Sequence, residues 1–452
     1  MKKLLQYLGN YKKESILGPL FKLLEASFEL IVPLVMAAII DTGVANADRP
    51  YIMKMSLVLF LLALIGLTCA ITAQYFAAKA AVGCATGLRH ALFEHIETLS
   101  FTEMDTVGTS TLITRMTSDV NQVQNGVNLV LRLFLRSPFI VFGAMVMAFT
   151  IDVKAALVFV VTIPLLSVVV FGIMLVSIPL YKKVQAALDK VLGITRENLT
   201  GSRVIRAFNK EQDEIAQFHE DNEALTKIQL YVGKISALMN PLTYIIINGA
   251  IVVLVWVGAI RVDNGNITQG QVVALVSYMS QILVELIKLA NLIININKSI
   301  ACMNRIETVL DMESSITEHP AAETGSLTSD GAGREGKETI PAENAVVFSK
   351  VGLTYAGASE EALSDIDFTV RRGETIGIIG GTGSGKSSVV NLIPRFYDAT
   401  RGEVLVDGKN VRDYTLEELR AKVGVVLQKA VLFKGTIREN LSWGNSDATD
   451  EE

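Results

Sequence analysis

The first 310 residues are dominated by apolar runs long enough to cross a membrane. Residues 55–78, 155–180 and 235–260 contain no charged side chain, and each run exceeds the roughly 18 residues that a membrane-spanning helix needs. Three further runs carry a few charged side chains, mostly toward one end, where long side chains can extend to the membrane surface: residues 16–40, 137–151 with the preceding turn, and 271–291. The pattern therefore predicts six membrane-spanning helices.

Lysine and arginine are distributed unevenly among the segments between these runs. The N-terminal segment and residues 181–234 are rich in both, whereas residues 41–54, 152–154 and 261–268 are short and poor in cations. Cytoplasmic loops of membrane proteins carry an excess of Lys and Arg. The N-terminal segment also lacks a compact apolar core followed by a small-residue cleavage site, so it is not typical of a signal peptide. We expect a retained cytoplasmic N-terminus and long cytoplasmic connections.

The long connections continue the helical pattern beyond the predicted spans. Apolar side chains recur at helical spacing at Leu88, Leu92 and Ile96, which predicts helices that extend far into the cytoplasm. Ser100 and Glu103 match a capping box and predict a short separate helix at the end of the first connection. Residues 201–211, GSRVIRAFNKE, are the corresponding candidate in the second connection. Long helices that end in short transverse ones are suited to contacting a soluble domain.

Charged residues inside the predicted spans allow two interpretations. Lys22, Glu25 and Glu29 are three and four positions apart, so they share one helix side. They could line a polar substrate pathway, because intramembrane charges are usually functional, or they could neutralise one another in a structural group. Glu285, which is followed by Lys288 one turn later, raises the same question.

Two arginines lie at the cytoplasmic end of the third span. Arg132 and Arg136 are placed about where this span leaves the membrane. We expect both side chains to extend to the membrane surface.

Composition supports a membrane protein and excludes several other classes. Half of the residues are hydrophobic, at 50%, and the mean hydropathy is +0.41, which is high for a soluble protein. The net charge of −5 comes without a basic block, so nucleic acid is not an expected partner. The three cysteines and four histidines are scattered and match no metal-site or disulfide spacing.

The character of the chain changes after residue 310. Residues 311–344 are acidic and rich in Gly, Ser, Thr and Pro, which predicts a flexible linker. From residue 345 onward, short apolar runs alternate with turn signals, and we predict strands at AVVFSKVGLTY, IDFTV and ETIGIIG. A second, soluble domain is therefore expected at residues 345–452.

The last of these predicted strands leads into a phosphate-binding motif. Gly380, Gly385, Lys386 and Ser387 match the P-loop pattern, and the apolar run that follows can begin a helix. Glycines allow backbone N–H groups to turn toward a phosphate, Lys386 would contact the β- and γ-phosphates of ATP, and Ser387 would bind magnesium. The residues predicted to bind the nucleotide in this loop are Gly380, Gly381, Thr382, Gly383, Ser384, Gly385, Lys386, Ser387 and Ser388.

Four further stretches, in order along the chain, resemble motifs of ATP-binding cassette exporters. LITRMTSDV and GSRVIRAFNKE resemble the two cytoplasmic coupling regions of the family, VVLQ resembles its glutamine loop, and LFKGTIRENLSWG resembles the stretch that follows that loop. The chain is thus similar to a half-transporter, which carries a membrane domain and a nucleotide-binding domain on one polypeptide.

The resemblance implies a fold, a set of ligands and a mechanism. It implies an all-α membrane domain of six helices with long cytoplasmic extensions at residues 1–310, followed by an incomplete α/β P-loop domain at 345–452. Tyr355 would stack on adenine, and Gln428 would contact Mg²⁺ together with Ser387. The family also implies a second half-transporter subunit as partner and a multi-pass location in the plasma membrane. ATP binding would draw the two nucleotide-binding domains together and reorient the membrane cavity.

Several motifs of the family are absent from the sequence. It contains no LSGGQ-like signature and no hydrophobic strand that ends in Asp then Glu. The run most similar to that strand, EVLVDGKN, is typical of a hairpin turn at Asp407–Gly408. Phosphoryl transfer needs a positioned water and a fixed metal, so we expect no ATP hydrolysis by the chain as it stands, and we interpret it as the N-terminal part of a longer exporter subunit.

Other functions stay open at this point. A non-hydrolysing subunit that binds ATP, or that only supplies membrane helices to a full-length partner, is the main alternative. A membrane-tethered P-loop kinase is disfavoured because no acceptor site is evident. The acidic residues Glu25, Glu29 and Glu285 are compatible with amphipathic or cationic drugs, lipids or peptides as substrates.

Overall fold

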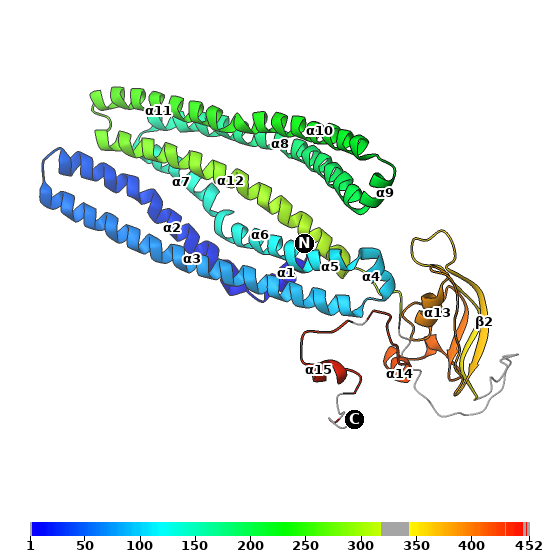
Figure 1. Ribbon diagram of the computed structural model, residues 1–452. Coiled ribbons are helices and arrows are strands. Elements are labelled where there is room, and N and C mark those ends of the chain that lie inside the picture. Colours follow the sequence, from blue (N-terminus) through cyan, green and yellow to red (C-terminus); the bar gives the residue numbers. More distant parts are fainter. Residues whose placement is uncertain (1, 318–342, 430, 446–448, 450–452) are drawn as a thin grey trace, which may run out of the picture. The chain divides into compact units, whose positions relative to one another are not determined.

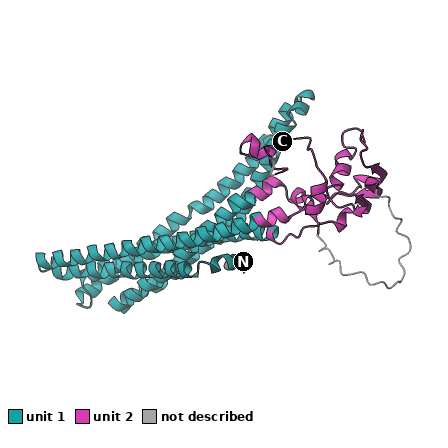
Figure 2. Cartoon of the chain, turned by 90° about the horizontal axis from the view of Figure 1, so that it is seen from below, with its two compact units in different colours: residues 1–93, 114–309 teal, residues 94–113, 310–452 magenta. Residues whose placement is uncertain are grey.

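The computed structural model describes residues 2–317, 343–429, 431–445 and 449. These residues form two compact units, one of residues 1–93 and 114–309 and the other of residues 94–113 and 310–452 (Figure 2). Most of the linker predicted at 311–344 lies outside the described residues.

The first unit contains the six membrane-spanning helices that the sequence predicts. Within the described residues, six helical segments are long and apolar enough to cross a membrane, and each contains one of the predicted runs. The segments are α2 (Lys12–Ala38) continued by η1 (Ile39–Val44), α3 (Arg49–Thr98), α5 (Thr109–Thr114) through η2 (Arg115–Asp119) and α6 (Val120–Leu133) to α7 (Arg136–Ile151), α8 (Val153–Thr200), α10 (Glu211–Ala237) with α11 (Met239–Asp263), and α12 (Gln269–Leu310). A further short helix, α1 (Lys2–Gly9), precedes them.

These helices are much longer than a bilayer is thick. The helix α3 contains 50 residues, which at about 1.5 Å per residue is about 75 Å, compared with about 30 Å for the hydrocarbon core. The prediction that the helices extend far beyond the membrane is thereby confirmed.

The helices pack through small side chains and a few buried polar contacts. The helix α8 runs alongside α10 and α11, and α2 packs against α7 (Figure 1). Ala26 and Ala144 are fully buried in the core between α2 and its neighbours, where small side chains allow close approach of helix backbones. Tyr278 of α12 is also fully buried, and its hydroxyl donates to the carbonyl oxygen of Leu30 at 2.6 Å. This bond joins α12 to α2.

Short helices form where the sequence predicts them. The helix α4 (Phe101–Val107) begins with a capping box, in which the hydroxyl of Ser100 accepts from the backbone N–H of Thr102 and the carboxylate of Glu103 accepts from the backbone N–H of Ser100 at 3.1 Å. In the second connection, α9 (Ser202–Ala207) forms inside GSRVIRAFNKE. Both predictions are confirmed.

The second unit contains a small antiparallel sheet with strand order β2-β1-β3-β4. Its strands are β1 (Asn344–Leu353), β2 (Leu363–Arg371), β3 (Arg401–Val406) and β4 (Lys409–Asn410). Phe348, Val351 and Val404 of the sheet form an apolar core with Leu392 and Leu419 from the helices α13 (Lys386–Leu392) and α14 (Leu416–Lys422). Another short helix, α15 (Ile437–Leu441), follows.

Two of the three predicted strands of this domain are confirmed, and one is not. AVVFSKVGLTY and IDFTV lie on β1 and β2, but residues 374–380, ETIGIIG, form no strand and are exposed. An apolar strand of this kind normally lies in a parallel sheet with both faces covered. Within the described ranges no strand pairs with residues 374–380, which explains why the apolar run stays irregular here.

The predicted hairpin at Asp407–Gly408 is confirmed. Strands β3 and β4 pair antiparallel across it, and both turn residues have positive φ, 50° for Asp407 and 78° for Gly408. Two successive positive φ angles are the signature of the tight turn that joins twisted strands. The carboxylate of Asp407 pairs with Arg372 at 2.7 Å and Lys422 at 3.0 Å, so its charge is balanced by two cations of the same domain.

Candidate functional site

The phosphate-binding motif forms one exposed loop that runs directly into α13. The loop turns through Gly383 and Gly385, whose φ angles are +85° and +83°. A Cβ atom at Gly385 would lie 2.6 Å from Cδ2 of Leu363. Both the left-handed backbone and this close approach require glycine at position 385. The structure therefore brings Gly380, Gly381, Thr382, Gly383, Ser384, Gly385, Lys386, Ser387 and Ser388 together as a single loop and helix start.

The side chain of Lys386 folds back over this loop. Its Nζ donates to the carbonyl oxygens of Gly380 at 2.9 Å and Gly381 at 2.6 Å. The ammonium thus lies over the loop backbone, where a bound phosphate would meet both its charge and the neighbouring backbone N–H groups. Ser387 is exposed at the first turn of α13, so its hydroxyl is free to bind a metal ion that accompanies the phosphates.

Tyr355 lies beside the start of the same helix. Its hydroxyl donates to Oγ of Ser388 at 2.8 Å, and its ring meets the ring of Tyr397 edge-on, with centroids 5.1 Å apart. The hydroxyl of Tyr397 in turn donates to the carboxylate of Asp105 on α4 at 2.5 Å. Burial and the Asp105 carboxylate raise the pKa of Tyr397 above its ordinary value. Adenine stacking by Tyr355 stays a prediction.

The chain of contacts from Ser388 to Asp105 was not expected from the sequence. It joins the helix of the phosphate loop to α4, through two tyrosines that are far apart along the chain. Phe101 of α4 reinforces the connection, since its ring lies 4.9 Å from that of Phe396. The sequence predicts a short helix at Ser100 that is suited to contacting a soluble domain, but it does not specify which residues make the contact.

Gln428 is not joined to the loop. It is exposed, lies outside helices and strands, and makes no hydrogen bond with Ser387 within the ranges that the structure describes. Its role as a Mg²⁺ ligand stays a prediction. No group of three His, Cys, Asp or Glu side chains that could hold a metal occurs in the described part of the chain.

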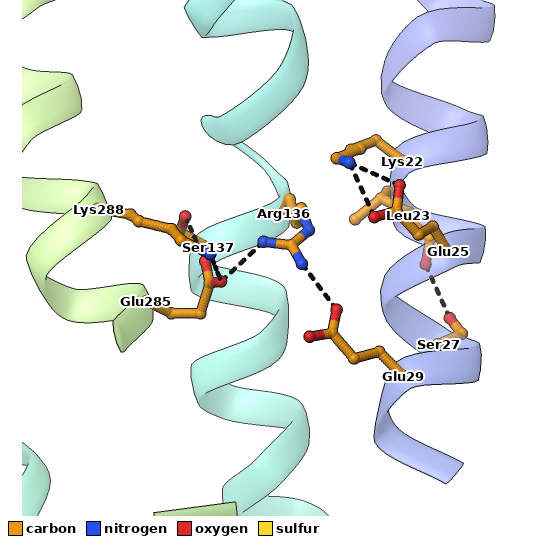
Figure 3. Close-up of polar contacts among 9 residues, drawn as sticks. All are labelled: Lys22, Leu23, Glu25, Ser27, Glu29, Arg136, Ser137, Glu285 and Lys288. Carbon is orange, nitrogen blue, oxygen red and sulfur yellow. Dashed lines mark hydrogen bonds and ion pairs between the residues drawn. The ribbon is translucent and has the colours of Figure 1, made fainter. Parts of the chain in front are cut away.

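The charged residues of the membrane domain form a paired cluster between α2, α7 and α12 (Figure 3). The guanidinium of Arg136 lies 2.7 Å from the carboxylate of Glu285 and 2.6 Å from that of Glu29. Glu285 is 2% exposed and also accepts from the hydroxyl of Ser137 at 2.9 Å and from Lys288 at 2.8 Å. Three helices are thus joined through one arginine.

Glu25 is paired within its own helix. Nζ of Lys22 lies 2.6 Å from its carboxylate, as the spacing along α2 allows. Glu29, by contrast, turns away from Lys22 and pairs with Arg136. All three acidic residues considered for a substrate pathway therefore have cationic partners, and their role in such a pathway stays a prediction.

Arg136 corrects one expectation from the sequence. Its side chain does not extend to the membrane surface but is buried, with 7% of the residue exposed, between two carboxylates. Buried charges in proteins are paired because an isolated ion is too costly to remove from water. The acidic residues in the first and last spans indicated that anionic partners for a buried cation were present. The sequence did not specify which helices would meet.

Comparison with known proteins identifies the family. The model of the ABC transporter transmembrane region matches residues 15–286, more than half of the chain, and the ABC transporter model matches residues 363–452. The chain belongs to the ABC transporter family. With a six-helix membrane domain followed by a nucleotide-binding domain, it is a half-transporter of the exporter type.

Curated relatives of this half-transporter cover most of its length. An uncharacterized ABC transporter ATP-binding protein of Mycobacterium tuberculosis is 34% identical over 441 residues, which cover 97% of the chain and 73% of the relative. A Bacillus subtilis protein, provisionally named a multidrug export ATP-binding/permease protein, is 31% identical over 100% of the chain and 77% of its own length. The ATP-dependent lipid A-core flippase of Desulfotalea psychrophila is 30% identical over 80% of the chain and 60% of its own length.

Proposed function

We propose that this half-transporter pairs with a second subunit and uses ATP with Mg²⁺ to export an amphipathic compound across the plasma membrane. In this proposal the N-terminus and the nucleotide-binding domain are cytoplasmic, as the excess of Lys and Arg in residues 181–234 favours. The names of two relatives, one for multidrug export and one for lipid A-core flipping, favour an apolar or amphipathic substrate.

The phosphate loop is the observation that carries the proposal. Two left-handed glycines turn its backbone, and Lys386 lies against the carbonyl oxygens of Gly380 and Gly381. Gly380 to Ser388 would hold the phosphates of ATP, Tyr355 would contact adenine, and Ser387 with Gln428 would hold Mg²⁺. Bound Mg²⁺ would neutralise charge on the phosphates.

ATP binding is the first test of this function. The full chain in lipid nanodiscs should bind a fluorescent ATP analogue in the presence of Mg²⁺, and Lys386→Ala should weaken binding at least roughly tenfold, because a charge-assisted contact to phosphate is lost. Cross-linking in the same nanodiscs should trap a dimer. A wild-type chain that binds no nucleotide would contradict the proposal.

Transport separates export from the non-hydrolysing alternative. Inside-out vesicles that contain the protein and a full-length partner subunit, which supplies the hydrolytic motifs, should accumulate a fluorescent amphipathic dye only when ATP and Mg²⁺ are present, and Lys386→Ala should reduce this accumulation. Accumulation that Lys386→Ala leaves unchanged would support a subunit that only supplies membrane helices to its partner.

A further inference from the structure

A cleft lies in the membrane domain, and its described lining does not include Arg136, Glu29 or Glu285. It is an open cleft of about 750 Å³ between α8, α10, α11 and α12. Its apolar wall includes Val170, Met174 and Ala290, which pack together, and Ile178 and Ile294 extend the same surface. Small-molecule sites are typically clefts of about 300–1,000 Å³ with mainly apolar walls, so the cleft has the size and lining of a ligand site.

Charge in this cleft is of one sign. Lys182 of α8 and Lys298 of α12 line it, and none of the described residues that line it is Asp or Glu. Both lysines are exposed, and neither has an ion pair within the part of the chain that the structure describes. The cleft therefore offers two cationic groups without internal counter-ions.

The same wall contains a buried hydroxyl group. Ser177 of α8 lines the cleft, is 7% exposed, and its Oγ makes no hydrogen bond with any residue that the structure describes. Buried polar groups are nearly always hydrogen-bonded, and each exception calls for a partner that the protein alone does not supply. Several other serines of the long helices, such as Ser167, donate to carbonyl oxygens of their own helix, in that case to Ile163 at 2.8 Å, although Ser15 of α2 shares the lack of a partner among the described residues. Ser177 is thus available to a bound molecule.

The cationic and apolar parts of the cleft lie at different depths. From Val170 to Lys182, α8 rises about 18 Å, so the apolar end reaches into the predicted span 155–180 while Lys182 lies just beyond its cytoplasmic end. On α12, Lys298 likewise follows the predicted span 271–291. The arrangement matches a molecule whose chain lies in the membrane and whose charged group lies at the inner surface.

We propose that this cleft binds a single-chain amphiphilic anion, with its apolar chain against Met174 and Ile294, its phosphate or carboxylate on Lys182 and Lys298, and a hydrogen bond from Ser177. This inference rests on the proposed function and gives the exporter a preference for anionic over cationic amphiphiles. Taken by themselves, the acidic residues of the spans suggest a preference for cationic substrates. Each of Glu25, Glu29 and Glu285 is neutralised by a cationic partner, however, so these residues do not oppose the binding of an anion.

Direct binding tests the charge preference. The full chain in nanodiscs of uncharged phosphatidylcholine is titrated with radiolabelled oleoyl lysophosphatidic acid, in competition with oleoyl lysophosphatidylcholine, oleylamine and inorganic phosphate. The anionic amphiphile should bind at least roughly tenfold more tightly than the zwitterionic and cationic ones, and phosphate without a chain should not compete, because both the charge and the apolar contact are needed. Equal binding of anion and amine would overturn the proposal.

Variants assign the effect to this cleft. Lys182→Gln with Lys298→Gln should weaken binding of the lysophosphatidate at least roughly tenfold, whereas Lys183→Gln, which removes the neighbouring exposed lysine outside the cleft, should change it less than roughly twofold. If the double variant does not fold, Met174→Trp fills the apolar wall and should reduce binding of all three amphiphiles. An effect of Lys183→Gln as large as that of the double variant would refute the assignment.

Nucleotide binding in the same samples separates this inference from the proposed function. Every cleft variant should bind the ATP analogue with wild-type affinity, because the phosphate loop belongs to the other unit. ATP binding together with no preference for the anion would defeat the cleft assignment alone. If the wild-type chain does not bind ATP, the proposed function is wrong. The lysophosphatidate measurements would then still decide whether the cleft binds an anionic amphiphile.

Discussion

Arg136 and Glu285 form an ion pair of 2.7 Å that is buried on both sides, with 7% and 2% of the two residues exposed. The pair joins α7 to α12, and Glu29 extends it to α2 (Figure 3). In a low-dielectric interior, each charge depends on the other for its stability. The pair is therefore a structural connection among three membrane helices.

Removing one partner of this pair should destabilise the membrane domain. Arg136→Met leaves the carboxylate of Glu285 with Lys288 and Ser137 but without its main buried partner, and it should lower the free energy of unfolding by about 3–5 kcal/mol. Denaturation of the purified protein in mixed micelles measures the change. The double variant Arg136→Met with Glu285→Met should recover part of the loss, since neither buried position then carries a charge, although Glu29 still lacks its partner.

Arg132 provides the matched control for this experiment. It lies one turn earlier in the chain and has no ion pair among the described residues. Arg132→Met should change the unfolding free energy by less than about 1 kcal/mol. If Arg132→Met lowers the unfolding free energy as much as Arg136→Met does, the destabilisation is not caused by breaking the buried ion pair.

Gly385 should be the most sensitive position of the phosphate loop. Gly385→Ala forces an alanine to a φ of +83° and places its Cβ within 2.6 Å of Leu363. The left-handed conformation alone costs roughly 1–2 kcal/mol, so the affinity for an ATP analogue should fall roughly tenfold. Gly377→Ala is the control, because its Cβ would meet no atom within 4 Å and its φ is not positive. Equal losses in the two variants would contradict the geometry.

The stability that the hydrogen bond from Tyr397 to Asp105 gives to the second unit should be lost at alkaline pH. Because burial and Asp105 raise the pKa of Tyr397 in the folded protein, its contribution is complete below the ordinary tyrosine pKa of about 10 and is lost as the pH rises through the folded value. Ionisation of tyrosine, followed by absorbance near about 295 nm, should therefore include one late-titrating group that Tyr397→Phe removes. If the spectrum of Tyr397→Phe titrates like that of the wild type, this hydrogen bond is not maintained in solution.

The capping box at Ser100 should control the stability of α4. Ser100→Ala removes the acceptor for the backbone N–H of Thr102, and such a change costs about 1 kcal/mol. Amide hydrogen exchange in α4 should become roughly fivefold faster. Thr106→Ala, whose hydroxyl only donates to a carbonyl oxygen of the same helix at 2.7 Å, should leave the exchange nearly unchanged.

Acid should weaken the same capping box. Burial raises the pKa of Glu103, but hydrogen bonds from Ser100 and Ser315 outweigh it and lower the pKa below the usual range. Glu103 therefore contributes stability at pH values above the ordinary glutamate pKa of about 4.3, and this contribution disappears as the pH falls through the lower folded value. Exchange in α4 should accelerate over that acidic window in the wild type but not in Glu103→Gln.

Local patterns of the sequence predicted a large part of this fold. The six spans, the long helical extensions, the capping box at Ser100 and the hairpin at Asp407 each depend on a few consecutive or helically spaced residues. The phosphate loop belongs to the same group, since the need for glycine at 385 follows from the motif itself. Such features arise from short-range sterics and from burial of a continuous apolar run.

Those local patterns did not predict the contacts between segments that are far apart in the sequence. The sequence placed Arg136 at a span end, and only the packing of α7 between α2 and α12 decides that it meets Glu29 and Glu285. The apolar run at 374–380 has strand propensity, yet no strand pairs with it within the described ranges, so propensity alone does not form a strand.

The sequence by itself determined that this chain is a membrane protein with a phosphate loop, because hydrophobic length and glycine spacing act locally. The tertiary structure alone decided which charges are neutralised and which remain available. Pairing depends on which helix faces which, and that arrangement buries Glu285 with Arg136, whereas Lys182 and Lys298 line an apolar cleft and form no ion pair with any described residue. Electrostatic energy depends on distance and burial, and neither quantity is encoded in residue spacing along one segment.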